Sequence, residues 1–129
     1  MNNFDQTKIV RAVCDALRDA GVSKKVFGNR PTSMAADLSD FVVCRVSGRV
    51  SDLAAFGECT LSVSLFAKDV ANMVNDKKLS VMQEKVICGL PRSLDGILID
   101  GTPNILGDSP DGNGYHARVI NYSLIIKSV

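Results

Sequence analysis

The residues able to perform chemistry are few in this chain and widely spaced. No two of the four cysteines form the close C-x-x-C pair that zinc sites usually use. The polar start of the chain lacks the charged-then-apolar order of a secretory signal. We therefore expect a reducing compartment and interpret the cysteines as small buried hydrophobic residues. They are Cys14, Cys44, Cys59 and Cys88.

The single histidine, His116, stands near Arg118 with no nucleophile beside it in the sequence. A catalytic relay needs a nucleophile, a base and an orienting acid in one place, so we interpret His116 as an exposed polar residue on a strand. Four aspartates lie in turn-forming stretches, where an Asp side chain commonly bonds nearby backbone amides. We expect no catalytic residue and no enzyme activity. These aspartates are Asp95, Asp100, Asp108 and Asp111.

Residues 109–115 resemble the middle of a calcium-binding loop of the helix-loop-helix type. That loop needs an acidic first ligand and a glutamate at the twelfth position, and Ser109 and Ile120 occupy those places. Gly112 and Gly114 fit a hairpin turn that uses positive φ angles. The sequence therefore predicts a turn here, with no metal. It also lacks the glycine patterns that hold nucleotide phosphates, so we expect no cofactor.

Length and charge exclude several classes of protein. At 129 residues the chain fits one domain, which we take as residues 1–129. Fifteen basic and fourteen acidic residues leave a formal charge of +1, without the basic stripe typical of nucleic-acid binding. No apolar run approaches the roughly 18 to 20 residues that cross a bilayer. We expect neither sequence-specific nucleic-acid binding nor a membrane partner.

Hydrophobic periodicity predicts two helices and three longer strands. The order of these elements is typical of an α+β fold, which we expect to be a mainly antiparallel sheet of four to five strands with two helices packed on one face. The stretches between the elements read as connections, at 28–40, 48–58 and 101–114. The predicted helices are 3–20 and Asp76–Gly89, the longer strands are 41–47, 59–68 and Tyr115–Lys127, and short strands are predicted at Val26–Phe27 and 97–100.

Two details of this pattern have alternative interpretations. In the strand 59–68 the odd-numbered residues are expected to face the core, so Phe66 points the other way. It is either an exposed anchor for a protein interface or part of a second buried layer. The start of the second helix is also ambiguous, because Ser80 and Gln83 form a second candidate capping box.

Five segments together resemble the tail terminator, or tail completion, proteins of long-tailed bacteriophages. They are "IVRAVCDAL", "FVVCRVSG", "CTLSVSLFAKD", "SVMQEKVICGLP" and "YHARVINYSLIIK". The resemblance lies in element order and hydrophobic rhythm and covers nearly the whole chain. It implies a small α+β protein that forms a ring, usually of six copies, on the head-proximal end of the tail tube. Such a ring stops tube growth and faces the head connector.

The resemblance implies three partners, which are further copies of the chain, the tail tube protein and a head–tail connector or neck protein. It places the protein in the virion, assembled in the bacterial host cytoplasm. A neck or head-completion ring stacked on the portal is the alternative, followed by a small cytosolic binding domain. Outward parity or loop position, and no family motif, gives the interface candidates Arg45, Arg49, Asp52, Phe56, Phe66 and Arg118.

Overall fold

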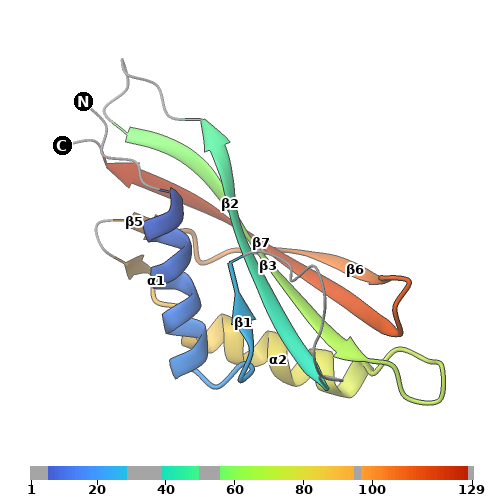
Figure 1. Ribbon diagram of the computed structural model, residues 1–129. Coiled ribbons are helices and arrows are strands. Elements are labelled where there is room, and N and C mark those ends of the chain that lie inside the picture. The colour runs from blue at the N-terminus through green and yellow to red at the C-terminus, as the bar shows by residue number, and fades with distance from the viewer. Residues whose placement is uncertain (1–5, 29–38, 50–55, 95–96, 128–129) are drawn as a thin grey trace.

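The computed structural model describes residues 6–28, 39–49, 56–94 and 97–127, shown in Figure 1. Within these ranges, the side chains of residues 6, 48–49, 56–59 and 126–127 are not described. The elements in chain order are α1 (Gln6–Asp19), β1 (Val26–Phe27), β2 (Asp40–Arg49), β3 (Phe56–Lys68), α2 (Asp76–Gly89), β4 (Ser93–Leu94), β5 (Ile97–Ile99), β6 (Asn104–Pro110) and β7 (Tyr115–Lys127).

The α+β class is confirmed, but the predicted sheet of four to five strands is wrong. The described part of the chain forms a seven-stranded sheet in the order β1-β2-β3-β7-β5-β4, with β6 also paired to β7. The sheet is mixed because β1 runs parallel to β2. Two parallel neighbouring strands need a long connection between them, and residues 28–39 between β1 and β2 are long enough to provide it. The predicted hairpin of β2 and β3 is confirmed as an antiparallel pair.

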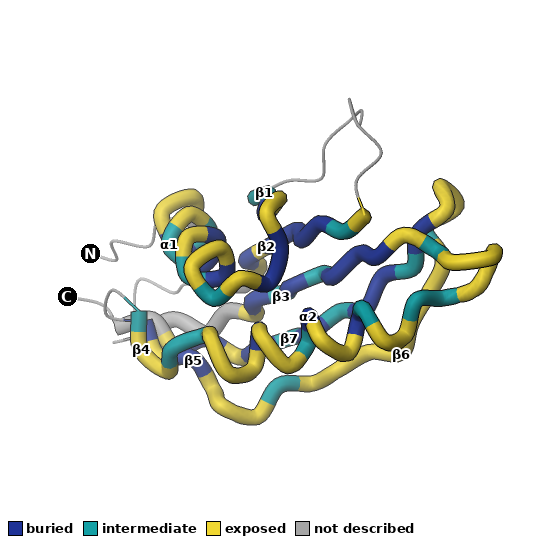
Figure 2. Tube along the Cα trace, turned by 90° about the horizontal axis from the view of Figure 1, so that it is seen from below, coloured by how far each residue is buried: buried dark blue, intermediate teal, exposed yellow. Residues whose placement is uncertain are grey.

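The strand β6 was predicted as part of a turn-rich connection, because Pro103, Gly107 and Pro110 interrupt any strand pattern there. All seven residues of β6 are exposed, so no apolar alternation marks it in the sequence. Proline and glycine are tolerated in an edge strand, which has a ladder on one side only. Figure 2 shows exposed residues along β6 beside the more buried central strands.

The main core lies between the two helices and one face of the sheet. The predicted apolar stripe of α2 is confirmed, since Leu79, Met82 and Val86 are buried. The odd-numbered residues of β3 also face this core, as predicted. Burying side chains of this size stabilises the fold by about 1.5–3 kcal/mol each. The residues contributed by the long strands are Val42, Cys44, Val46, Leu61, Val63, Leu65, Ala67, Ile120, Tyr122 and Leu124.

A second buried cluster lies on the other face of the same sheet. The ring of Phe41, which is fully buried, stacks on Phe66 at 4.4 Å between centroids and meets Tyr115 edge-on at 5.3 Å. Val43 and Ala117 complete the cluster. Phe66 therefore belongs to a second buried layer, and the alternative of an exposed anchor is wrong.

The predicted end of α1 is confirmed, and the second candidate start of α2 is not. Gly21 follows α1 with φ 74°, which suits glycine at a helix end. The side chain of Asn75 caps α2 by accepting a hydrogen bond from the Lys78 backbone N–H at 3.2 Å. Ser80 and Gln83 lie inside the helix, and their side chains accept hydrogen bonds from Arg118.

Among the described residues, no helix is both long enough and apolar enough to span a membrane.

Burial divides the cysteines. Cys14 and Cys44 are buried, as predicted, whereas Cys88 is exposed on α2. A hydrogen bond with Cys14 and burial raise the pKa of the Cys44 thiol well above its ordinary value. The side chain of Cys59 lies outside the description.

We predict that Phe41→Ala lowers the free energy of unfolding by about 3–5 kcal/mol, because it removes the central ring of the second cluster. The matched control is Leu98→Ala at an exposed strand position, expected to cost less than about 0.5–1 kcal/mol. Urea unfolding followed by circular dichroism measures both. Equal costs for the two variants would show that the second cluster does not hold the sheet.

A second prediction concerns Tyr122, whose buried hydroxyl has no hydrogen-bond partner in the part of the chain that the structure describes. Burial raises the pKa of Tyr122 to about 12. Stability linked to this group is complete below about pH 10, the usual tyrosine pKa, and is lost as the pH rises toward about 12. Tyr122→Phe should remove this alkaline loss and leave stability at pH 7 unchanged within about 1 kcal/mol.

Alkaline difference spectroscopy checks the Tyr122 prediction, because the chain has only two tyrosines. Tyr122→Phe should abolish a phenolate transition near pH 12. A wild-type spectrum in which both tyrosines ionise by about pH 10, while the chain stays folded, would contradict it.

Candidate assembly surface

The turn between β6 and β7 lies at the end of the sheet that points away from α1 (Figure 1). Gly112 and Gly114 adopt φ angles of 85° and 88° at its turn, as the sequence predicted. A carboxylate oxygen of Asp111 accepts hydrogen bonds from the backbone N–H groups of Asn113 at 2.7 Å and Tyr115 at 3.2 Å. The turn is therefore a closed local structure, made by glycines and an aspartate cap.

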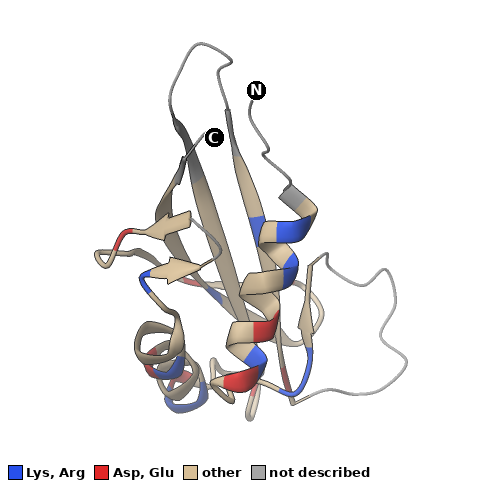
Figure 3. Ribbon diagram, turned by 90° about the vertical axis from the view of Figure 1, so that its left-hand side faces the viewer, with Lys and Arg blue, Asp and Glu red and all other residues tan. Residues whose placement is uncertain are grey.

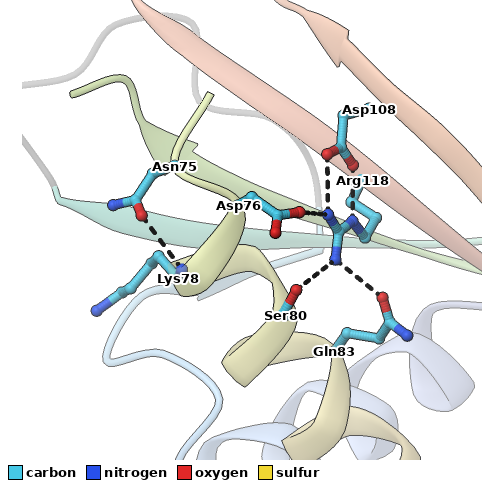
Figure 4. Close-up of polar contacts among 7 residues, drawn as sticks. All are labelled: Asn75, Asp76, Lys78, Ser80, Gln83, Asp108 and Arg118. Carbon is cyan, nitrogen blue, oxygen red and sulfur yellow. Dashed lines mark hydrogen bonds and ion pairs between the residues drawn. The ribbon is translucent and has the colours of Figure 1, made fainter. Parts of the chain in front are cut away.

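Arg118 of β7 lies at the centre of a polar network that joins the hairpin to α2 (Figure 4). Its Nε and Nη2 atoms donate to the two carboxylate oxygens of Asp108 at 2.6 and 2.8 Å. Nη2 also donates to Asp76 at 2.8 Å, and Nη1 donates to Ser80 at 3.2 Å and to Gln83 at 3.1 Å. A guanidinium carries five N–H donors, and these five hydrogen bonds match that number.

The electrostatics of the network favour the charged forms of both Arg118 and Asp108. Hydrogen bonding by Arg118 holds the pKa of the Asp108 carboxyl below its ordinary value, against the opposing effect of burial. The pKa of Arg118 is raised chiefly because its guanidinium donates hydrogen bonds to the Asp108 carboxylate. The two side chains are largely covered, with exposed fractions of 11% for Arg118 and 22% for Asp108, although Asp108 counted with its backbone is among the exposed residues of β6. Bidentate pairing of this kind is stronger and more directional than a surface ion pair.

The sequence analysis predicted that Arg118 points outward, toward a partner, and this predicted orientation is wrong. The even-numbered residues of β7 face the helices, where Ile120 and Leu124 join the main core, so Arg118 points at α2. A usable signal existed in the helix. Asp76, Ser80 and Gln83 recur at steps of four and three residues, and such spacing puts three polar groups on one helix face.

The surface of the hairpin is formed by β6. Ile105 and Leu106 are 40% and 45% exposed, and they stand opposite Ile120 and Val119 of β7. The register shifts between Leu106 and Ser109, which marks a bulge of the kind found at sheet edges. The hairpin thus presents an edge strand whose two exposed apolar side chains point to opposite faces of the sheet. Arg118 joins this strand to α2.

The opposite edge of the sheet carries a groove of about 680 Å³. It is lined by residues of α1, β2 and β3 and by Gly28, which follows β1. Arg45 is exposed there, and Figure 3 shows both basic and acidic residues along α1, with basic residues just before β1. Described lining residues include Thr7, Val10, Gly28, Arg45, Ser47 and Ser62.

The structure separates the six interface candidates. Arg45 is exposed, while Phe66 and Arg118 are buried within the chain, 7% and 9% exposed. Arg49 ends β2 and Phe56 begins β3, but their side chains are outside the description. Asp52 falls in residues 50–55, outside the described residues. Contact of any of them with a partner stays a prediction.

The side chains that could take part in catalysis or bind a metal do not lie together in the described part of the chain. The His116 Nδ1 lies 2.6 Å from a carboxylate oxygen of Asp69, and the two side chains are only 21% and 18% exposed. His116 is therefore paired and partly buried, which corrects the interpretation of an exposed polar residue on a strand. Among the described residues, no three His, Cys, Asp or Glu side chains are grouped to hold a metal ion.

We predict that Arg118→Met lowers the free energy of unfolding by about 3 kcal/mol at pH 7, because Asp108 keeps a partly buried charge without its partner. The pKa of Asp108 is lowered in the folded state, so the stability from the pair is present above about pH 4. It is lost as the pH falls through the lowered pKa. The difference between wild type and Arg118→Met should therefore shrink in acid.

Chemical denaturation at a series of pH values between about 2 and 7 tests this, in the range where an aspartate titrates. Arg11→Met, at an exposed position of α1, is the matched control and should cost less than about 0.5 kcal/mol at every pH. A cost for Arg118→Met that does not change with pH would mean that Asp108 is not the partner that matters.

No known family model matches the sequence, and no curated protein matches it. Among solved structures, a chain of the virion of a native gene transfer agent (GTA) particle is similar, with a TM-score of 0.64. The two chains are 13% identical, and the likeness covers 98% of this chain and 100% of the other. At this identity the likeness shows a shared fold that extends from one end of the chain to the other.

Proposed function

We propose that this chain is a structural protein of a phage-like virion. The observation that carries the proposal is the full-length likeness to a chain of a gene transfer agent virion, which leaves almost no residue of either chain unmatched. A fold alone does not determine function. The surface features of this chain support the same conclusion independently.

Those features suit assembly better than catalysis. Two titratable pairs join elements of the described fold, Arg118 with Asp108 and His116 with Asp69. Exposed large apolar side chains occur at several surface positions, including Ile105 and Leu106 on the edge strand β6 and the more exposed Val70 and Met73 before α2. We therefore propose that the protein is not an enzyme and acts through its shape.

The finer proposal is a ring at the head-proximal end of the tail tube, which stops tube growth and joins the tail to the head connector. The sequence resemblance implies six copies, with the tail tube protein and a connector or neck protein as partners. A closed ring of identical copies requires two different, complementary patches on each copy, and the open sheet offers two separate edges, one in β6 and one beside β2. A neck ring stacked on the portal shares these features and is the second candidate.

Deleting the gene from a phage or particle-producing genome that carries it separates these roles. Loss of a tail terminator should give tail tubes of uncontrolled length without heads, because nothing stops polymerisation of the tube. Loss of a neck component should give tails of normal length beside unattached heads. Electron microscopy of lysates measures tail length and attachment, and a plasmid copy of the wild-type gene should restore both.

A direct assay accompanies the deletion. Mass spectrometry of purified particles should detect the chain as a stoichiometric component, enriched at one end of the tail by gold labelling. Particles that lack the chain, together with a normal deletion phenotype, would overturn the virion proposal and favour a small binding domain.

A further inference from the structure

Two cysteine side chains from different elements meet in the main core. Cys14 lies on the face of α1 that Val13 and Leu17 bury against the sheet, and Cys44 is an inward residue of β2, on which α1 packs. The two thiols are hydrogen-bonded to each other. Both are free and almost fully covered, with exposed fractions of 4% and 0%. The fold therefore brings together two thiols that are distant in sequence.

The fold also excludes the other two cysteines as partners of Cys44. The register partner of Cys44 on β3 is Val63, and Cys59 lies four residues from Val63 along the same strand. Four residues of a strand span roughly 13 Å, whereas the Cα atoms of a disulfide lie within about 7 Å of each other. Cys88 is exposed on α2, outside the core that holds Cys44. Cys14 is thus the cysteine that Cys44 can reach.

The surroundings of the pair make Cys14 the more reactive thiol. The hydrogen bond with Cys44 lowers the pKa of the Cys14 thiol, assisted by the Arg18 guanidinium, against the opposing effects of burial and of Asp15. Arg18 is fixed near the pair because its Nη2 donates to the Val26 carbonyl at 2.6 Å. The same thiol hydrogen bond and burial raise the pKa of Cys44, so Cys44 keeps its proton. Because the thiolate is the nucleophile in cysteine chemistry, Cys14 reacts first.

We infer that Cys14 and Cys44 form an intramolecular disulfide when the folded chain meets a peroxide, and that this bond joins α1 covalently to β2. The Cys14 thiolate attacks one oxygen of hydrogen peroxide and the O–O bond breaks. Cys14 becomes a sulfenic acid, and the departing hydroxide takes up the proton that Cys14 released. The Cys44 sulfur then attacks the Cys14 sulfur and the S–O bond breaks, so the hydroxyl group leaves with the Cys44 proton as water. Two thiols and one peroxide give one disulfide and two waters.

The bond closes residues 14–44 into a covalent loop that contains the end of α1, β1 and the start of β2. Closing a loop of this length restricts the unfolded chain and so stabilises the folded state. In a reducing compartment the two thiols stay free, and the bond forms once the chain has left it. The inference does not depend on the proposed virion role.

Peptide mapping by mass spectrometry provides the test, because trypsin places the four cysteines in four different peptides, 12–18, 26–45, 50–68 and 86–92. The chain used is Cys88→Ser, which lacks the exposed thiol that could join two copies. It is reduced, freed of reductant and treated with hydrogen peroxide under native conditions. Peptides 12–18 and 26–45 should become linked, with loss of two of the three remaining thiols. Dithiothreitol should reverse both changes.

The matched control is Cys14→Ala/Cys88→Ser, which should keep both of its thiols under the same treatment. Peroxide should raise the melting temperature of Cys88→Ser by roughly 10 °C and leave that of the control unchanged. The mapping of Cys88→Ser involves no core substitution, so it stands even where the control is less stable.

Three outcomes overturn the inference. In the first, Cys14 and Cys44 stay free in Cys88→Ser at a peroxide concentration that fully oxidises Cys88 of the wild type. In the second, peptide 50–68, which carries Cys59, is linked to 26–45 in place of 12–18. In the third, the bond forms only in urea or lowers the melting temperature, since the fold would then not hold the two thiols in bonding geometry. None of these results bears on the particle and deletion experiments.

Discussion

The anchoring of the β6–β7 hairpin by Arg118 is the interaction on which the candidate surface depends. Three segments distant in sequence, β6, β7 and the first turns of α2, meet at one guanidinium whose hydrogen bonds are all made within the chain. An edge strand with every residue exposed has little burial of its own to hold it. A bidentate ion pair with low exposure supplies the missing constraint, because both its strength and its direction depend on geometry.

A second constraint comes from burial on both faces of one sheet. The helices cover one face, and the cluster around Phe41 packs on the other. Strands β2 and β3 therefore cannot slip by one residue, since a slip would exchange the two apolar sets. This rigidity has a consequence for assembly. The outward features, which are the β6 edge and the groove beside β2, are carried at fixed positions on opposite sides of one body.

The same arrangement explains why chemistry and surface are separated in this chain. Two polar groups that the sequence analysis considered for catalysis or for an interface are bonded within the chain, His116 to Asp69 and Arg118 to Asp108. Apolar side chains that would normally be buried are exposed on β6 instead.

The sequence by itself determined both helices, the three long strands and the glycine turn before Tyr115, because periodicity and turn chemistry are local and report which face is buried. It also determined that Leu61 and Phe66 lie on opposite faces. Only the tertiary structure decided that Phe66 is covered, that 104–110 is a strand, and that Arg118 bonds Ser80 and Asp76, residues 38 and 42 positions away. An edge strand without burial leaves no periodic signal, and the partners of a charged group are set by which distant segments the fold brings together.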